Sequence, residues 1–308
     1  MYQPNTVVLN RFTIQERLAF GAFSVVYRAF DDHIQKDICL KQEKLDEEGG
    51  QTMIEHEFHV AKSFDSPFLC KSYDFFLIDN NKFVSMELLD DNLINIRRKR
   101  KNPPSVPMLI NIAIQTLKGL AVMHQKNMIH SDIKPSNFAV RLNMNQSSYD
   151  IVLFDFGLSQ KDDEDPQITE YRNKLVRNPR YLSIHTHLTN QWTQTDDIYS
   201  LIYSLSDFCN DGLPWDGRTT NNLVFEIKNN YDLKLLLPPE LHVLIENVEQ
   251  PANIIIPKLE TVLNSMARNL EEEIHYIIDP KDPDLKPKKI KYIFEKGSKE
   301  KFTNQHSA

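Results

Sequence analysis

Short apolar runs separated by polar and charged residues dominate the first 90 positions of the chain. Three of these runs, Phe12–Leu18, Val25–Phe30 and Ile38–Lys41, are rich in β-branched and aromatic residues. Two more, Phe68–Leu77 and Phe83–Leu89, follow after a gap. Because runs of this length and composition are typical of strands, the pattern predicts a five-stranded antiparallel sheet.

The gap between the third and fourth runs has a helical rather than a strand period. Within Thr52–Phe64, the side chains of Phe58, Ala61 and Phe64 recur every three residues, which places them on one face of a helix. We therefore expect a single helix packed against the sheet, so that residues 1–89 form a small β-rich unit.

From Asp90 onward, helical periodicity replaces the strand pattern. The segment Pro107–Gln125 carries one apolar stripe, formed by Leu109, Ile112, Ala113, Leu117, Leu120 and Met123. Three further helices are expected at Thr195–Phe208, Pro238–Val248 and Pro257–Glu273, the last with its proline in the first turn. The pattern predicts an α+β protein with a larger, mainly helical unit over residues 90–278 and a flexible basic tail over 279–308.

Composition limits the class of protein. A chain of 308 residues with 41% apolar and 26% charged residues can form one large two-lobed domain or two small ones. We expect no membrane insertion, because no tract approaches the apolar length of a bilayer span and the first eight residues lack a signal-peptide pattern. The net charge of −7 argues against direct nucleic-acid binding.

Three scattered cysteines, Cys39, Cys70 and Cys209, indicate neither a disulfide framework nor a zinc site. A reducing cytoplasm therefore fits this pattern. We also expect the protein to be a monomer. The basic run Arg97–Lys101 is interpreted as a solvated helix face, and the alternative, a nuclear-import or anionic-partner site, would extend the location to the nucleus.

The polar residues of Ile129–Asn137, followed eighteen residues later by Asp155-Phe156-Gly157, suggest a specific chemistry. Phosphoryl transfer needs a carboxylate that orients the attacking hydroxyl and accepts its proton, and an amide and a second carboxylate that hold metal ions. Asp132, Asn137 and Asp155 suit these three roles. Asp-Phe-Gly alone occurs by chance in many proteins, so the prediction rests on the order and spacing of both motifs.

A lysine and a carboxylate upstream complete this pattern. Lys41 ends a buried strand, where an ammonium can reach the α and β phosphates of a nucleotide. Its anionic partner is expected to be Glu57, because this choice turns Phe58 and Ala61 inward; Glu55, on another face of the helix, is the alternative.

The loop Leu18–Val26 has the position of a phosphate-binding loop but keeps only one glycine, Gly21. Small neighbours, Ala19 and Ser24, leave the backbone accessible, so we expect a higher nucleotide KM rather than no binding. Cys39 is either a small core residue or a thiol that faces the adenine. The predicted nucleotide-contacting residues are Leu18, Ala19, Phe20, Gly21, Ser24, Val26, Cys39, Lys41, Glu57, Met86, Glu87 and Leu89.

Together these motifs resemble the protein kinase superfamily, and more narrowly its casein kinase 1 group. The narrower resemblance rests on Met86–Leu89, Arg180–Ile184 with His187, the pair Asp196-Asp197, and Gly212–Trp215. It covers residues 12–215 well and fades beyond them. It implies a two-lobed kinase fold, with ATP and Mg²⁺ held between the lobes, and transfer of the γ-phosphate to serine or threonine hydroxyls of proteins. Lys134, two residues after Asp132, would steady the transferred phosphate.

Several residues depart from the kinase pattern. Ser131 stands where most kinases have an arginine that pairs with a phosphorylated activation loop, so we expect no need for that phosphorylation. Asn178 replaces a threonine usual in serine/threonine kinases. His130 is interpreted as a structural residue.

The resemblance also implies a preference for acidic or phosphate-primed substrates, with Arg180 in the anion site. Lys174 and Arg177 could add positive charge there, while the acidic run Asp162–Asp165 would oppose an acidic peptide or simply be a solvated loop. The remaining alternatives are a pseudokinase scaffold, supported by the altered glycine loop, and a small-metabolite kinase.

Overall fold

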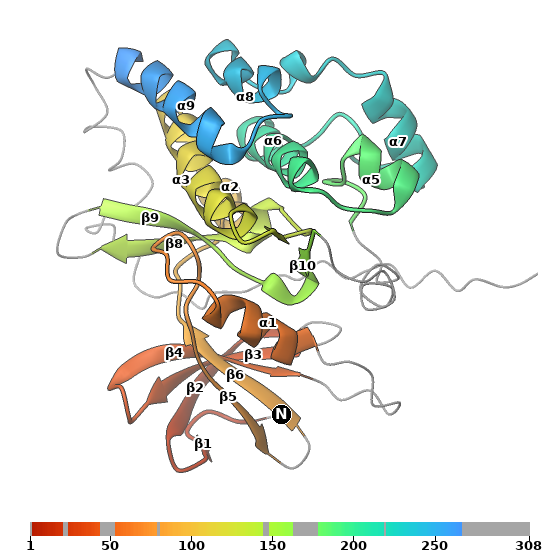
Figure 1. Cartoon of the computed structure of the whole chain (residues 1–308). Helices are drawn as coiled ribbons and strands as arrows, with labels where there is room; N and C mark the ends of the chain where they lie inside the picture. Colours follow the sequence, from red (N-terminus) through yellow and green to blue (C-terminus); the bar gives the residue numbers. More distant parts are fainter. Residues whose placement is uncertain are drawn as a thin grey trace, which may run out of the picture.

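The computed structural model describes residues 2–20, 24–43, 53–78, 81–143, 148–162, 178–218 and 220–266. These residues form a sheet-rich N-terminal lobe and a mainly helical C-terminal lobe (Figure 1). The α+β, two-lobed expectation is therefore confirmed. The chain passes from one lobe to the other between Glu87, the end of strand β6, and Leu93, the start of helix α2.

The N-terminal sheet has six antiparallel strands in the order β1-β2-β3-β4-β6-β5, so the expectation of five was one too few. Their bounds are Val7–Val8, Phe12–Phe20, Ser24–Asp31, Lys36–Glu43, Asn81–Glu87 and Ser72–Ile78 in that order. The missed strand is β1, whose two residues pair with Phe12 and Thr13. Two residues cannot show an alternating pattern, so the sequence held no signal for this strand.

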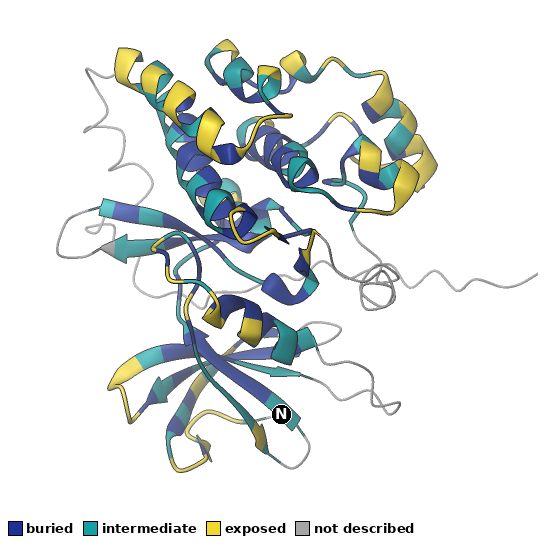
Figure 2. Ribbon diagram, in the orientation of Figure 1, coloured by how far each residue is buried: buried dark blue, intermediate teal, exposed yellow. Residues whose placement is uncertain are grey.

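Each face of this sheet is covered by apolar side chains. On one face the rings of Phe12, Phe76 and Phe83 stack in a row, with centroids 5.2 and 5.3 Å apart. On the other face lies helix α1, Met53–Lys62, which buries Ile54, Val60 and Ala61 (Figure 2). Glu57 is buried with them although it is charged, and it therefore needs a cation.

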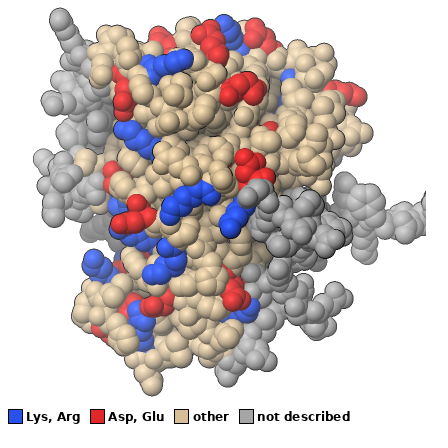
Figure 3. All heavy atoms as spheres, in the orientation of Figure 1, with Lys and Arg blue, Asp and Glu red and all other residues tan. Residues whose placement is uncertain are grey.

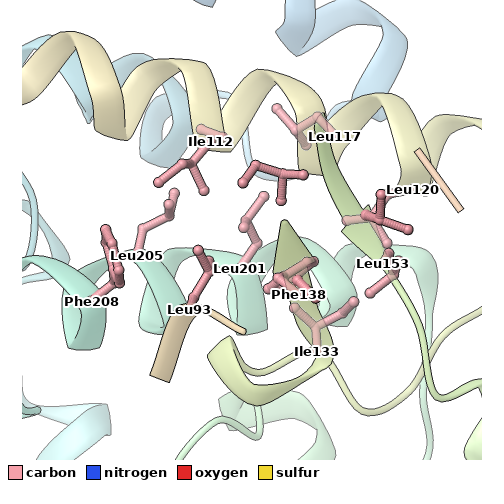
Figure 4. Close-up of a cluster of buried hydrophobic side chains, with 14 of the residues drawn as sticks. Leu93, Ile112, Leu117, Leu120, Ile133, Phe138, Leu153, Leu201, Leu205 and Phe208 are labelled. Carbon is pink, nitrogen blue, oxygen red and sulfur yellow. The ribbon is translucent and has the colours of Figure 1, made fainter. Parts of the chain in front are cut away.

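The C-terminal lobe is built around helix α3, Val106–His124, which Ser105 caps by accepting from the N–H of Met108. Ile112 of α3 faces Leu205 of α6, and Leu120 of α3 lies beside Leu153 (Figure 4). The expectation that no tract is apolar enough to cross a membrane was wrong for α3, whose mean hydropathy is 1.5 over 18 residues. However, 61% of that window is buried inside the protein, as expected for a core helix.

The other helices surround α3 and α6 (Figure 1). They are α2 Leu93–Lys99, α5 Ile184–Thr189, α6 Gln194–Asn210, α7 Asn221–Asn229, α8 His242–Glu246 and α9 Ala252–Met266, with short 3₁₀ turns at Leu233–Leu235 and Pro239–Leu241. Two expectations need correction. The helix expected at Pro238–Val248 is a 3₁₀ turn followed by α8. Pro257 lies inside α9 rather than in its first turn, because the buried stripe of Ala252, Ile255 and Leu259 extends past the proline.

The basic run at the end of α2 is not simply a solvated face. Arg97 pairs with the buried carboxylate of Asp207 on α6, and Arg100 contacts Asp211 at 2.6 Å. These cations dock α2 on α6. On the face of the molecule shown in Figure 3, the basic and acidic side chains of the described residues are interspersed.

Candidate active site

Two small two-stranded sheets bring the polar motifs together. The loop that carries Asp132 lies between β7, Met128–Ile129, and β8, Phe138–Asn143. Asp155 follows β9, Ser148–Leu153, which pairs with β8 along its whole length. The N–H of Phe154 donates to the carbonyl of Asn137 at 3.1 Å. This hydrogen bond ties the residue next to Asp155 to the end of the loop that carries Asp132.

Asp132 is in direct contact with the two polar residues that the sequence placed beside it. Its Oδ2 atom accepts from Lys134 Nζ at 2.7 Å and from Asn137 Nδ2 at 3.1 Å. Asn137 Nδ2 also donates to the Asp132 carbonyl at 2.9 Å. The carboxylate is thus held in one orientation, with a cation at hydrogen-bond distance.

Lys41 of β4 bridges two carboxylates. Its Nζ atom donates to Glu57 Oε2 at 2.6 Å and to Asp155 Oδ1 at 3.1 Å, although Asp155 lies 114 residues further along the chain. Glu55, the alternative partner, instead accepts from Lys82 at 2.6 Å. The structure therefore places Glu57, and not Glu55, beside Lys41.

The charges of these three groups follow from their surroundings. Burial alone would lower the pKa of Lys41, but Asp155 and Glu57 outweigh it, so the pKa is raised and the lysine stays cationic. Burial would raise the pKa of Asp155, but Lys41 and Lys134 outweigh it, so that pKa is lowered. For Glu57 burial prevails and raises its pKa. The site thus offers one fixed cation and one anionic carboxylate.

Asp197, in the first turn of α6, holds the backbone of the loop that carries Asp132. Its carboxylate accepts from the N–H groups of His130 at 2.8 Å and Ser131 at 2.9 Å, and it contacts His124 Nε2 at 3.0 Å. In the sequence, Asp197 contributed only to the family resemblance, and its contact with the loop was not predicted. The one signal in the sequence was a pair of aspartates at the start of a predicted helix. No local pattern shows that one of them binds the N–H groups of His130 and Ser131.

Two backbone positions in the site are unusual. Ser131 and Asp155 have φ values of 65° and 67°, in the left-handed region that non-glycine residues rarely adopt. Such a conformation costs of order 1 kcal/mol and persists where the surroundings impose it. At Ser131 the hydrogen bond to Asp197 contributes that constraint.

His130 is fully buried, and burial lowers the pKa of its ring. Its Nε2 atom lies 3.2 Å from the Phe154 carbonyl. Its position is therefore that of a structural residue.

A cavity that is open to solvent lies between the lobes at this site. Its walls are Val26, Cys39, Lys41, Glu57, Cys70, Met86, Glu87, Leu89, Phe154 and Asp155. Cys39 therefore lies on the cavity wall, where burial raises the pKa of its thiol to about 12 and keeps it neutral. Cys70 and Phe154 were missed. Phe154 is next to Asp155 in the sequence, and this adjacency was a signal for its place in the cavity wall. Cys70 reaches the wall because its neighbour Leu69 pairs with Leu153, and this pairing is tertiary.

The remaining predicted nucleotide contacts that the structure describes, Leu18, Ala19, Phe20 and Ser24, do not line this cavity. Leu18 and Ala19 are buried in the same apolar cluster as Val26, and Ser24 is buried in β3. The side chain of Phe20 is 53% exposed. Gly21, the one glycine of the loop, lies outside the described residues, as do Lys174, Arg177, Asp163–Asp165 and the predicted tail.

Glu87 contributes to the link between the lobes with its side chain. Its carboxylate accepts from Arg141 of β8 through two hydrogen bonds, of 2.5 and 2.6 Å. Arg141 also donates to the carbonyl of Pro67 at 2.5 Å. The carboxylate of Glu87 is thus bound by the C-terminal lobe.

This pair should contribute measurably to stability. We expect Arg141→Met to lower the free energy of unfolding by about 1.5–3 kcal/mol, because Glu87 loses a bidentate, charge-assisted partner. Urea denaturation with an unchanged m value would measure it. The control is Lys234→Met, which breaks a pair with Glu246 whose two side chains are about half exposed, and it should leave the free energy of unfolding nearly unchanged. Equal losses in the two variants would contradict the prediction.

Arg180, which the family resemblance assigns to an anion site, is paired with carboxylates of the same chain. Its Nη2 atom donates to Asp207 Oδ1 and to Asp216 Oδ2, each at 2.5 Å. The guanidinium is therefore already neutralised by two carboxylates of the same chain. Its neighbour Asn178 accepts from the Arg180 N–H at 3.0 Å, which makes a local turn.

Comparison with known proteins identifies the class. Residues 12–275 match the protein kinase domain family, so the chain belongs to that family. It is also similar to a probable serine/threonine-protein kinase of Dictyostelium discoideum, with 27% identity over 286 residues. The aligned region covers 87% of this chain and 56% of that protein, so the chain spans about half the length of the curated relative it matches.

Proposed function

We propose that the chain is a protein serine/threonine kinase that transfers the γ-phosphate of ATP to hydroxyl groups of proteins. The observation that carries this proposal is the position of Lys41, whose ammonium joins Glu57 and Asp155 at the wall of the interlobe cavity. An ammonium at this place can bind the α and β phosphates beside a metal-binding carboxylate. The kinase named in the comparison supports the serine/threonine class.

Each polar residue then has one role. Asp132 orients the acceptor hydroxyl and takes its proton, while Lys134, 2.7 Å away, steadies the transferred phosphate. Asp155 and Asn137 would hold Mg²⁺, since an anionic carboxylate and an amide oxygen are ligands that this ion prefers. When bound, the ion would neutralise charge on the phosphates. Val26, Cys39, Met86 and Leu89 provide the apolar walls for the adenine.

The finer assignment is to the casein kinase 1 group. It is supported by Arg180–Ile184, followed in α5 by His187, and by the pair Asp196-Asp197 at the start of α6. Arg180 is paired with two carboxylates of the same chain. We therefore propose that the enzyme phosphorylates hydroxyl groups of unprimed proteins and does not require a phosphate-primed substrate. All three cysteines are free, in keeping with action as a monomer in the cytoplasm, with the nucleus as the alternative location.

We further propose that activity does not require phosphorylation of the activation loop. Ser131 offers no charge to a phosphate, and its N–H is instead held by the buried Asp197. Phosphatase treatment should therefore leave the rate of peptide phosphorylation within about threefold of the untreated enzyme. A loss of about tenfold or more would contradict this proposal.

The main proposal is tested by phosphotransfer itself. Purified protein is incubated with radiolabelled ATP, Mg²⁺ and casein, and the labelled residues are identified by phosphoamino-acid analysis. Wild type should label serine or threonine, and Lys41→Met should not. Nucleotide binding without any labelling would favour the pseudokinase scaffold, which is the alternative suggested by the single glycine of the loop.

A further inference from the structure

Four consecutive backbone carbonyls, those of Pro179, Arg180, Tyr181 and Leu182, each accept a hydrogen bond from a side chain elsewhere in the C-terminal lobe. Lys228 Nζ donates to Pro179 O and to Leu182 O, both at 2.7 Å. Trp215 Nε1 donates to Arg180 O at 2.9 Å, and Ser200 Oγ donates to Tyr181 O at 2.8 Å. We call residues 179–182 the anchored segment.

Lys228 provides two of these four hydrogen bonds from an unusual environment. It lies on α7 and is only 1% exposed. Its ammonium lies over the rings of Tyr203 and Trp215, 4.7 and 4.9 Å from their centroids. Among its contacts in the described part of the chain there is no carboxylate. Burial lowers the pKa of Lys228 well below its ordinary value, which shows how unfavourable the site is for a cation.

The surroundings of Lys228 consist of hydrogen-bond acceptors and ring faces. Besides the two carbonyls, His187 Nε2 lies 3.5 Å from the ammonium. Burial and the nearby Lys228 lower the pKa of His187 to about 4, so the ring is neutral at pH 7 and that nitrogen can accept. Three acceptors around Nζ match the three donors of an ammonium. A leucine or methionine could fill this space without the cost of burying a charge, but it could not donate hydrogen bonds to the two carbonyls. We therefore attribute the lysine at this position to the hydrogen bonds that it gives to the carbonyls.

The anchored segment is tied to the same helix as the catalytic loop. Ser183, directly after it, contacts Asp196 of α6 through its hydroxyl. The adjacent Asp197 holds the N–H groups of His130 and Ser131, next to the catalytic Asp132. Neighbouring residues of one helix therefore fix the segment and the loop. A protein substrate lying along the segment would be placed relative to Asp132 by these contacts.

We propose that Lys228 is a positioning residue for the protein substrate: by holding the carbonyls of Pro179 and Leu182 it fixes the surface that presents the acceptor hydroxyl to Asp132. This inference rests on the proposed transfer to protein hydroxyls. Lys228 does not line the interlobe cavity, and its hydrogen-bond partners are the carbonyls of Pro179 and Leu182 rather than Asp132 or Asp155, so its loss should affect the protein substrate and not the nucleotide.

The test compares three variants with wild type in steady-state phosphorylation of casein. Lys228→Met keeps the length of the side chain and removes its donors; we expect the KM for casein to rise about tenfold, with the KM for ATP unchanged within about twofold. Lys228→Arg, which restores donors and charge, should recover part of the loss. The control is Lys234→Met, which makes the same substitution at a lysine paired with Glu246 on the surface. This variant should have the same KM values as wild type.

Hydrogen exchange of peptides covering residues 178–183, together with the rise in Tm on adding ATP and Mg²⁺, gives a readout that does not depend on turnover. Faster exchange in this segment of Lys228→Met, with an unchanged rise in Tm, supports the proposal. An unchanged KM for casein, or equal increases in the KM for casein and for ATP, overturns it. If wild type binds ATP but labels no protein, the proposed function itself fails. This result is distinguishable from a failure of the Lys228 proposal, in which wild type labels casein and Lys228→Met has the same KM for casein.

Discussion

The variant Asp132→Asn is expected to lose about 10²–10⁴ in kcat while its affinity for ATP changes little. Asparagine has nearly the same shape and can still accept hydrogen bonds from Lys134 and Asn137, which lie 2.7 and 3.1 Å from the carboxylate. Its amide cannot take up the proton of the attacking hydroxyl. The loss is therefore chemical, equivalent to about 2.7–5.5 kcal/mol of transition-state stabilisation.

Single-turnover phosphorylation of casein measures this step apart from product release. The control is Asp37→Asn, which makes the same change at a partly buried carboxylate that pairs with Arg28 and does not line the interlobe cavity. That variant should retain wild-type kinetics. Turnover of Asp132→Asn within about fivefold of wild type would refute the assignment of Asp132 as the base.

The variant Lys41→Met is expected to lose about 10²–10³ in kcat/KM for ATP. The substitution removes the cation that would bind the phosphates and leaves the carboxylates of Glu57 and Asp155 without it. Burial already raises the pKa of Glu57, so the carboxyl becomes protonated once Lys41 is gone, and helix α1 loses its charged link to β4.

A matched lysine on the same lobe provides the control. Lys82 pairs with Glu55, also on α1, at 2.6 Å, but Glu55 is 42% exposed. Because half-exposed ion pairs contribute about 0–1 kcal/mol, Lys82→Met should keep kcat/KM within about threefold of wild type. Activity of Lys41→Met within about tenfold of wild type would contradict the role of the Lys41 bridge.

The contacts between the polar residues of the Asp132 loop could be predicted because their spacing is local. Asp132, Lys134 and Asn137 occupy one short loop, so their intervals along the chain nearly define their contacts in space. The choice of Glu57 over Glu55 could be predicted because helical geometry separates the two faces of α1. Periodicity also located the core helix α3, but it could not show that neighbouring elements bury α3.

Contacts between distant segments could not be predicted from the sequence. The charges of Arg97, Arg100 and Arg180 were visible, and their patterning suggested solvent or an anionic ligand. The structure instead pairs them with Asp207, Asp211 and Asp216. Similarly, nothing near Lys228 in the sequence indicates the carbonyls of Pro179 and Leu182, more than forty positions before it.

The amino-acid sequence by itself determined which chemical groups are available and their order: two carboxylates, an amide and two lysines at intervals typical of phosphoryl transfer. Only the tertiary structure decided which charges meet, how Asp197 holds the loop, and where the anchored segment lies. The physical reason is that periodicity and spacing report interactions within a few turns of chain. The burial that raises or lowers a pKa, and the partner that compensates it, come from segments far apart in sequence.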